Sequence, residues 1–261
     1  MKIFITGASS GIGEALAFEY VKRHGSGKTF IGLSARRSEY LQKIKQKLAS
    51  NDQVQCITYP LDVRDHTALT NAANQFIAQF GAPDVVIACA GVSSGTLTEH
   101  AEDTVAFQAI MDINVIGLVN TFQPFINAMR QAGQGQLVGI ASVAGVRGLP
   151  GAGAYSASKA AAIAYLESLR VEMQHHNIAV TTIAPGYIRT PMTDINTYTM
   201  PFLMDVDIAA HKFVDAIECK RRFVVIPWQM GWVAKLMRFI PPVLWDFLAK
   251  NAPHKKRIPL A

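Results

Sequence analysis

Short β-rich runs alternate with longer helix-like stretches along most of this chain, and this alternation constrains the fold more than any other feature. Several β-rich runs are almost continuously apolar, as expected for parallel strands buried on both faces. About six strand–helix repeats predict an α/β fold with a doubly wound parallel sheet and right-handed crossovers. The predicted strands are Lys2–Thr6, Thr29–Ser34, Gln55–Tyr59, Asp84–Cys89, Gln136–Ala141, Ala179–Ala184 and Phe223–Ile226. The predicted helices include Gly11–His24, Ser38–Ala49, Asp65–Phe80, Thr104–Ala132, Tyr155–His176 and Asp207–Glu218.

The length of 261 residues is compatible with one large α/β domain or two small ones. No internal repeat, low-complexity tract or linker precedes residue 227. We therefore predict a single domain of about seven strands, with its main unit at 1–226 and a short helical C-terminal extension of the same domain at 227–261.

The positive charge is concentrated at the C-terminal end. From Lys220 onward the chain has nine Lys or Arg residues against one acidic residue, Asp246, which gives this end a charge of +8. Because the net charge of the whole chain is +6, residues 1–219 together carry −2. A nucleic-acid-binding protein would carry such charge on a recognition motif, and the sequence shows none. We therefore expect no nucleic-acid partner.

Three cysteines, Cys56, Cys89 and Cys219, are odd in number and follow no metal or redox spacing. This pattern predicts a reducing, intracellular setting with no disulfide framework and no metal site. Cys89 could be a reactive thiol, but a packed core thiol is favoured. The chain opens with MKIFITG, a strand that enters a glycine turn, so no removable segment is expected. The sequence contains no run of about 18 uninterrupted apolar residues, so no transmembrane span is predicted.

A glycine-rich turn, TGASSGIG at Thr6–Gly13, joins the first strand to the first helix. Gly7, Gly11 and Gly13 allow a sharp turn and let the backbone approach a pyrophosphate at the helix N-terminus. The intervening Ser9, Ser10 and Ile12 would then also lie against the bound nucleotide. Glycines serve ordinary turns as well, but the place between strand and helix favours nucleotide binding.

The second strand ends in Arg36 and Arg37, where a site for NAD would usually have an acidic residue. Arg36 can form a bidentate, charge-assisted contact with an adenosine 2′-phosphate. The alternative is that both arginines only solvate a helix start. The pair favours NADP(H) over NAD(H).

Further motifs follow in one order: Asn114 in DINVIG, Ser142 in IASVAG, Tyr155 and Lys159 in YSASK, and Pro185-Gly186 in IAPGYIRTPM. Together with the glycine turn, this set resembles the short, single-domain subgroup of the short-chain dehydrogenase/reductase family over roughly residues 2–226. The resemblance implies a Rossmann-type fold, a dinucleotide-binding catalytic unit at 1–226, and a dimer or tetramer. It also implies an oxidoreductase that moves hydride between nicotinamide and a carbonyl or alcohol.

Residue chemistry supports the catalytic set of Asn114, Ser142, Tyr155 and Lys159. Tyr155 and Lys159 are four residues apart on a predicted helix, so they share a face, and an ammonium favours the phenolate. Tyr155 would donate a proton to the carbonyl oxygen, while the Ser142 hydroxyl hydrogen-bonds that oxygen. In the family, the lysine also holds the nicotinamide ribose, and the asparagine links a helix distortion and a water to it. Each residue taken singly also has an ordinary structural explanation.

The same resemblance also implies further contacts with the cofactor. They place Asp62 and Val63 at the adenine, Ala90 and Gly91 beside the cofactor, and Ile188 and Thr190 at the nicotinamide carboxamide. The family usually has Asn-Asn-Ala-Gly after the fourth strand, whereas this chain has Ala88-Cys89-Ala90-Gly91, so we expect altered local bonding there. Ser10 stands where many NADP-preferring relatives have a basic residue, which leaves the phosphate contact to Arg36 and Arg37.

The substrate region is predicted from composition. Gly186–Asp205, with Met192, Met200 and Pro201–Met204, should form a mobile lid whose apolar lining favours a hydrophobic ketone or aldehyde. Beyond residue 226, apolar and aromatic residues recur at helical spacing, and Pro241-Pro242 should divide them into two short helices. This extension could cover the pocket, form a homodimer or homotetramer interface, or touch the inner face of a membrane.

Three function classes remain open on the sequence alone. The leading one is an NADP(H)-dependent cytoplasmic reductase. The others are a cofactor-responsive regulatory protein and a membrane-associated interaction protein on the same fold. The complete Asn114, Ser142, Tyr155 and Lys159 set favours the enzyme, since a sensor needs no proton relay.

Overall fold

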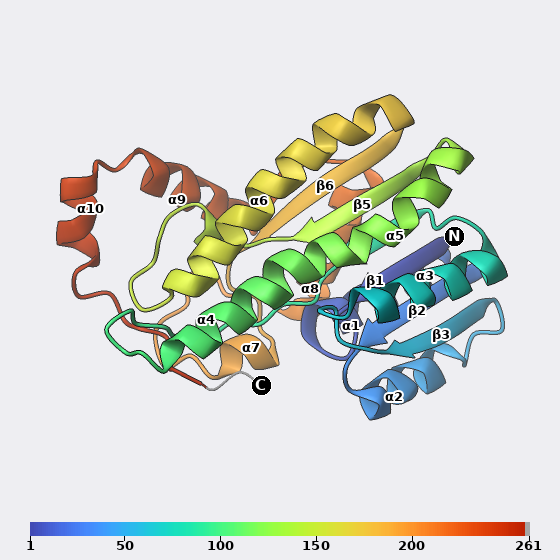
Figure 1. Ribbon diagram of the computed structural model, residues 1–261, viewed down its shortest axis with the longest axis horizontal. Helices are drawn as coiled ribbons and strands as arrows, with labels where there is room; N and C mark the ends of the chain where they lie inside the picture. The colour runs from blue at the N-terminus through green and yellow to red at the C-terminus, as the bar shows by residue number, and fades with distance from the viewer. Residues whose placement is uncertain (259–261) are drawn as a thin grey trace.

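The computed structural model describes residues 1–258 and contains one seven-stranded sheet in the order β3-β2-β1-β4-β5-β6-β7 (Figure 1). Every neighbouring pair is parallel. The predicted doubly wound α/β fold is therefore confirmed, and each predicted strand boundary lies within one residue of the observed one. The strands are β1 (Lys2–Thr6), β2 (Thr29–Ala35), β3 (Val54–Pro60), β4 (Val85–Ala88), β5 (Gly135–Ile140), β6 (Ile178–Pro185) and β7 (Phe223–Ile226).

Helices cover both faces of the sheet, as Figure 1 shows. One buried apolar cluster joins the sheet to α1, α2 and α8, and a second joins its other face to α3, α5 and α6. Because both faces are covered, the strands are apolar almost throughout. The helices are α1 (Gly11–His24), α2 (Ser38–Leu48), α3 (His66–Phe80), α4 (Asp103–Met111), α5 (Gly117–Ala132), α6 (Gly153–Met173), α7 (Pro191–Asp194), α8 (Val206–Glu218), α9 (Trp228–Phe239) and α10 (Pro242–Ala249).

The helix predicted at Thr104–Ala132 is interrupted. Its α-helical parts, α4 and α5, are separated by a π-helical turn at Asp112–Ile116. Two short 3₁₀ turns occur elsewhere, η2 at Val143–Gly145 and η3 at Gln174–His176. Such π turns need tertiary support, which helical periodicity does not reveal.

The continuous helical run Asp103–Ala132 is long and apolar enough to cross a membrane by length and composition alone. However, 56% of its most apolar window is buried inside the protein. Its side chains Phe122, Phe125 and Met129 are fully buried in the cluster beneath α5. We therefore assign this run as a core helix of the domain.

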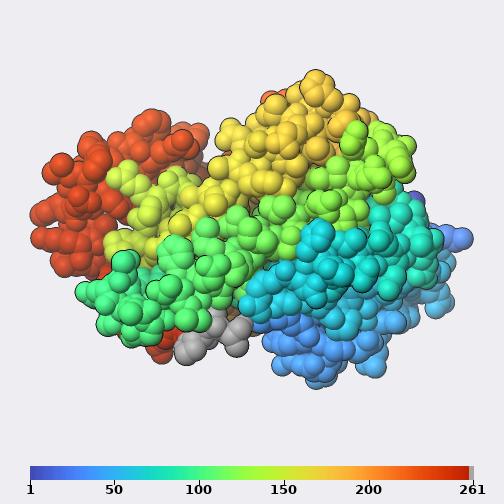
Figure 2. Space-filling model, in the orientation of Figure 1, coloured from blue at the N-terminus to red at the C-terminus, as the bar shows by residue number. Residues whose placement is uncertain are grey.

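The double proline separates two short helices, α9 and α10, as expected. They form a projection at one end of the molecule, coloured red in Figures 1 and 2. Arg147 holds the projection, because its guanidinium donates hydrogen bonds to the carbonyls of Met237 (3.0 Å) and Ile240 (2.8 Å) and lies over the Trp245 ring. Of the predicted extension 227–261, residues 259–261 lie outside the described part of the chain.

Candidate active site

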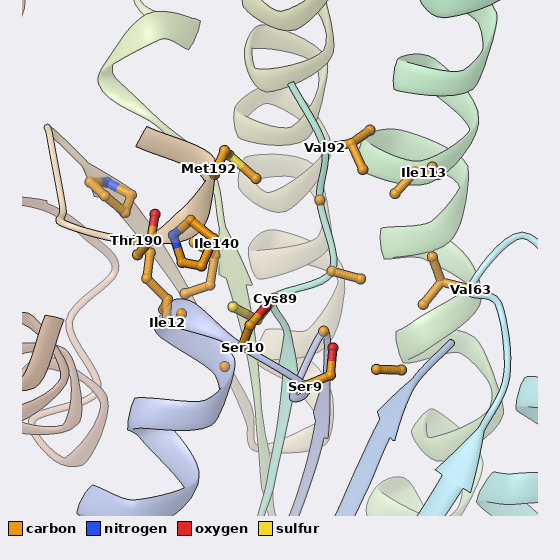
Figure 3. A pocket seen from close by; sticks show the side chains of 18 of the residues that line it. Ser9, Ser10, Ile12, Val63, Cys89, Val92, Ile113, Ile140, Thr190 and Met192 are labelled. Carbon is orange, nitrogen blue, oxygen red and sulfur yellow. The ribbon is translucent and has the colours of Figure 1, made fainter. Parts of the chain in front are cut away.

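A cavity of about 350 Å³ opens at the carboxyl ends of β1, β4, β5 and β6, where ligands of doubly wound sheets usually bind (Figure 3). Every residue predicted to contact the cofactor lines it, and so does Ser142. The predicted lining residues are Gly7, Ser9, Ser10, Gly11, Ile12, Gly13, Arg36, Arg37, Asp62, Val63, Ala90, Gly91, Tyr155, Lys159, Pro185, Gly186, Ile188 and Thr190. Met192 of the predicted lid also lines it, together with residues that were not predicted, among them Cys89, Val92, Ile113 and Ile140.

The glycine turn fits a pyrophosphate. Gly7 and Gly11 have φ angles of 69° and 57°, which L side chains rarely adopt. A Cβ atom on Gly7 would lie 2.6 Å from the backbone nitrogen of Ala90, so only glycine allows this approach of the two strand ends. Ser10 is the N-cap of α1 but makes no side-chain cap bond, so the first N–H groups of the helix face the cavity without that cap. A dinucleotide phosphate would match these donors and the helix dipole.

Arg37 is fixed onto the glycine turn. Its Nη2 donates hydrogen bonds to Ser9 Oγ (3.0 Å) and Ser10 Oγ (2.9 Å), and its guanidinium stacks over Tyr40 at 4.4 Å. Cationic charge is therefore held at this end of the cavity, beside Arg36.

Asp62 lies opposite these arginines. Burial acts to raise the pKa of Asp62, but hydrogen bonds from Arg64 and the nearby charge of Arg36 outweigh it and hold the pKa below its usual range. The Arg64 guanidinium contacts Asp62 Oδ2 at 2.7 and 3.0 Å, an ion pair that the sequence interpretation did not include. The Asp62 carboxylate, which was predicted to contact the adenine, is thus ionised and already bound by one cation.

Tyr155, Lys159 and Ser142 meet at the other end of the cavity. Burial raises the pKa of Tyr155, and a hydrogen bond with Ser142 partly offsets this effect. The Lys159 Nζ donates to the carbonyl of Ile140 at 2.9 Å and lies 5.8 Å from the centre of the Tyr155 ring. Burial lowers the pKa of Lys159 to about 8. The phenol is therefore protonated at neutral pH and has an ammonium beside it.

Asn114 lies behind the cavity wall rather than in its lining. It occupies the π-helical turn, is 1% exposed, and exchanges two hydrogen bonds with the backbone of Val92 (2.8 and 3.0 Å). Its Nδ2 also donates to Ser158 Oγ at 3.0 Å, and Ser158 donates to the carbonyl of Tyr155. The hydrogen bonds of Asn114 therefore reach α6 through Ser158, a residue of the YSASK motif that was not among the predicted site residues.

The altered stretch after the fourth strand is apolar in character. Ala88 pairs with Thr6 and Gly139 inside the sheet, and no side-chain amide is present at this position. Cys89 packs against the core and lines the cavity, and burial raises its pKa to about 12. Its thiol therefore stays protonated, which agrees with the favoured core role and not with a reactive thiolate.

The predicted lid contributes less apolar surface to the cavity than expected. Thr190 and Met192 face the cavity in Figure 3, and both belong to its lining. Phe202 is 51% exposed instead, and Met204 packs against the core, where its backbone pairs with Tyr187 and Arg189. The methionine and phenylalanine content of the segment therefore overestimated the apolar lining. The backbone of Met204 is bridged to that of Ile188, and its side chain packs against the core.

Comparison with known proteins agrees with this geometry. The family profile described as short chain dehydrogenase matches residues 1–199. An uncharacterized oxidoreductase of Myxococcus xanthus is 34% identical over 247 residues, covering 95% of each chain. The solved structure of L-sorbose reductase from Gluconobacter frateurii, complexed with NADPH and L-sorbose, is 25% identical with a TM-score of 0.75, covering 86% of this chain and 94% of its own. The chain therefore belongs to the short-chain dehydrogenase family and is an oxidoreductase of that family.

The structural relatives differ in their bound nucleotide. The sorbose reductase is described with NADPH, whereas a short chain dehydrogenase from Mycobacterium paratuberculosis is described bound to NAD. The second structure is 24% identical, has a TM-score of 0.73, and covers 85% of this chain and 93% of its own. The bound nicotinamide dinucleotide therefore differs between these two structural neighbours.

Proposed function

We propose that this protein is an NADP(H)-dependent reductase that converts an apolar ketone or aldehyde into an alcohol. The observation that carries the proposal is the convergence of Tyr155, Lys159 and Ser142 at one end of a cavity whose other end is formed by the glycine turn and two arginines. A nucleotide-binding sensor on the same fold would need the glycine turn and the arginines but not the Tyr155, Lys159 and Ser142 end.

Each side chain has a definite role in this proposal. The protonated phenol of Tyr155 donates its proton to the carbonyl oxygen, and the Ser142 hydroxyl hydrogen-bonds that oxygen. The ammonium of Lys159 favours the resulting phenolate and holds the cofactor's ribose. When bound, the nicotinamide supplies the hydride that reduces the carbonyl carbon. Asn114 positions α6 through Ser158, and Cys89 and Ile140 contribute apolar lining to the cavity.

NADP(H) is preferred over NAD(H) in this proposal because of charge. Arg36 and Arg37 adjoin the adenosine end, where a 2′-phosphate accepts bidentate hydrogen bonds. The acidic residue that an NAD site usually has after the second strand is absent here, since Arg36 and Arg37 stand in its place.

The decisive experiment is NADPH oxidation, followed optically, with ketones and aldehydes graded by size and polarity. Tyr155→Phe should lower turnover by about a hundredfold or more, since general acid catalysis contributes that much. Tyr20→Phe is the matched control, because Tyr20 is a fully buried tyrosine in the cluster between α1 and the sheet, away from the cavity. Equal turnover by wild type and Tyr155→Phe would refute the role of the phenol. Faster reduction of small polar ketones than of apolar ones would refute the substrate class.

The cofactor preference has its own test. Arg36→Ala should lower the ratio of NADPH to NADH affinity by about tenfold or more, the value of a charge-assisted contact. Arg130→Ala, at the exposed end of α5, is the control for a general loss of positive charge. An unchanged ratio in Arg36→Ala would contradict the NADP(H) assignment.

A second role, peripheral membrane contact, is favoured by the outer surface of α9 and α10. Its apolar side chains are exposed, with Phe239 at 82% and Trp232 at 66%, and Lys235, Arg238 and Lys250 lie among them. We propose that this α9–α10 face touches the anionic inner face of a membrane while the enzyme otherwise resides in the cytoplasm. The predicted homodimer or homotetramer is retained as a proposal, to be tested by light scattering.

A further inference from the structure

The chain returns to the active site after α10. Residues 251–258, here called the C-terminal strap, run beside the loop that follows β4. The backbone nitrogen of Gly95 donates to the carbonyl of Lys256 at 2.8 Å, and Ser94 exchanges two 2.8 Å hydrogen bonds with the backbone of Ile258. These contacts hold the strap against the loop at Ser93–Gly95, which follows the cavity-lining residue Val92.

Two further contacts fix the ends of the strap. Arg257 forms ion pairs with Glu102 (2.7 Å) and Asp103 (2.9 Å) at the start of α4. His254 packs closely against Gly151, just before α6. The strap therefore bridges the segments that precede α4 and α6, and Lys255 lies between its two fixed points.

Lys255 reaches the catalytic tyrosine. Its Nζ donates a 2.9 Å hydrogen bond to Ser93 Oγ and lies 5.7 Å from the centre of the Tyr155 ring. Lys159 Nζ lies 5.8 Å from the same centre but belongs to the helix that carries Tyr155. The ring thus adjoins two ammonium groups, one from α6 and one from a segment about a hundred residues further along the chain.

The ammonium of Lys255 lacks a carboxylate partner within residues 1–258. No acidic side chain of that range lies within ion-pair distance of its Nζ, and burial lowers its pKa to about 8 without a compensating charge. An ammonium has three N–H donors, and Ser93 accepts only one of them. A partly buried cation is costly unless another group pairs with it.

We propose that Lys255 binds a carboxylate of the substrate, so that the natural substrate is an apolar oxo acid, or the matching hydroxy acid in the reverse direction. This inference rests on the proposed reductase function. Lys255 adjoins the cavity through Tyr155 without lining it, so the carboxylate lies beyond the reacting carbonyl and outside the nucleotide-binding part of the cavity. The apolar body of the substrate then contacts Val92 and Met192, and its acid group meets the strap.

The test compares aryl and aliphatic oxo acids of graded length with their methyl esters, which keep the carbonyl and lose the charge. In wild type, at least one acid should have a KM about tenfold or more below that of its ester, as a charge-assisted hydrogen bond implies. Lys255→Met should abolish this difference and leave the ester kinetics nearly unchanged, while Lys255→Arg should keep much of it. Lys256→Met, the exposed neighbour on the same strap, should behave as wild type.

Binding of the same acids to the enzyme with NADP⁺, measured by calorimetry, separates the two proposals. If no acid or ester is reduced but an acid binds in a Lys255-dependent way, the reductase proposal fails and the anion site stands. If acids and esters have equal KM in wild type, or if Lys255→Met weakens both alike, the anion site is refuted while the reductase stands. Thermal unfolding of each variant shows whether a substitution has released the strap, since a variant that loses these contacts should unfold at a lower temperature than wild type.

Discussion

The side-chain amide of Asn114 donates a 3.0 Å hydrogen bond to Ser158, and this bond ties the π-helical turn to the helix that carries Tyr155 and Lys159. Asn114 also satisfies both backbone groups of Val92, so a single buried amide joins the loop after β4, the π turn and α6. The geometry of the catalytic end therefore depends on a group that does not line the cavity.

Asn114→Ala should accordingly lower both stability and turnover. It leaves the backbone N–H and carbonyl of Val92 without their partner, which should cost about 1–3 kcal/mol in unfolding free energy. It also frees Ser158 and α6, so kcat should fall while NADPH affinity changes little. Denaturant unfolding and steady-state kinetics measure the two effects.

The matched control is Gln136→Ala. Gln136 is a buried amide with two hydrogen bonds, to Thr181 and to the carbonyl of Ile217, and it lies at the opposite end of β5 from the cavity. It should lose similar stability and keep its turnover. Equal losses of kcat in the two variants would show that Asn114 acts on activity through stability alone.

Gly7→Ala should abolish cofactor binding. The substitution places a Cβ atom 2.6 Å from the backbone of Ala90 in a left-handed conformation, so the two strand ends would have to separate where the pyrophosphate binds. NADPH fluorescence titration should show at least a tenfold loss of affinity.

Gly133→Ala provides an unusually close comparison for that prediction. Gly133 has a φ of 65°, against 69° for Gly7, but an added Cβ there meets nothing within 4 Å. It should cost about 1 kcal/mol of stability through the backbone alone, with NADPH affinity unchanged. Similar affinities in both alanine variants would contradict the pyrophosphate cradle at Gly7.

The rate of reduction should fall as the pH rises above about 8. Burial lowers the pKa of Lys159 to about 8. Above that pH the lysine is neutral and no longer favours the phenolate, whereas burial raises the pKa of Tyr155 and keeps the phenol protonated. The profile of kcat/KM for a neutral ketone therefore has a descending limb set by the lysine.

Lys255 has a pKa lowered to about 8 as well, so its variant is the necessary control. With a neutral ketone, Lys255→Met should retain the descending limb, because Lys255 would act only on a charged substrate. If Lys255→Met loses the descending limb, the group that titrates near pH 8 is Lys255 and not Lys159.

The strand order along the chain explains why the residues that line the candidate nucleotide cavity could be predicted from the sequence. Gly7, Arg36 and Ile188 each follow a strand at its carboxyl end, and parallel strands bring those ends together at one edge of the sheet. Once the alternation of strands and helices was recognised, the motifs had to meet there. The order of the strands within the sheet did not need to be known for this step.

Lys255 and the π turn could not be predicted in that way. The strap is held by contacts between segments far apart in the chain. Arg147 bonds the end of α9, and Arg257 pairs with Glu102 and Asp103 at α4. The basic composition of residues 220–261 indicated a positive charge, but not that one of its lysines lies beside Tyr155. Similarly, Asn114 distorts the helix through Val92, which helical periodicity does not register.

The α9–α10 face leads to the last prediction. Because Trp232 and Phe239 are largely exposed with Lys235 and Arg238 nearby, the protein should sediment with vesicles that contain anionic lipid and much less with neutral vesicles. Added salt should weaken this binding, since screening reduces the contribution of the basic residues. Substitution of both aromatic residues by serine should abolish it, and the strap remains in place, unlike in a deletion of 227–261.

Val105 and Phe107 supply the matched control for that substitution, since they are exposed apolar residues on α4, outside the α9–α10 face. Their replacement by serine should leave vesicle binding intact. If no variant sediments, or if all sediment equally, the membrane proposal is wrong. If the Trp232 and Phe239 substitution instead converts an oligomer into monomers in light scattering, the α9–α10 face is an interface between copies of the chain, because the same apolar surface can bind either partner.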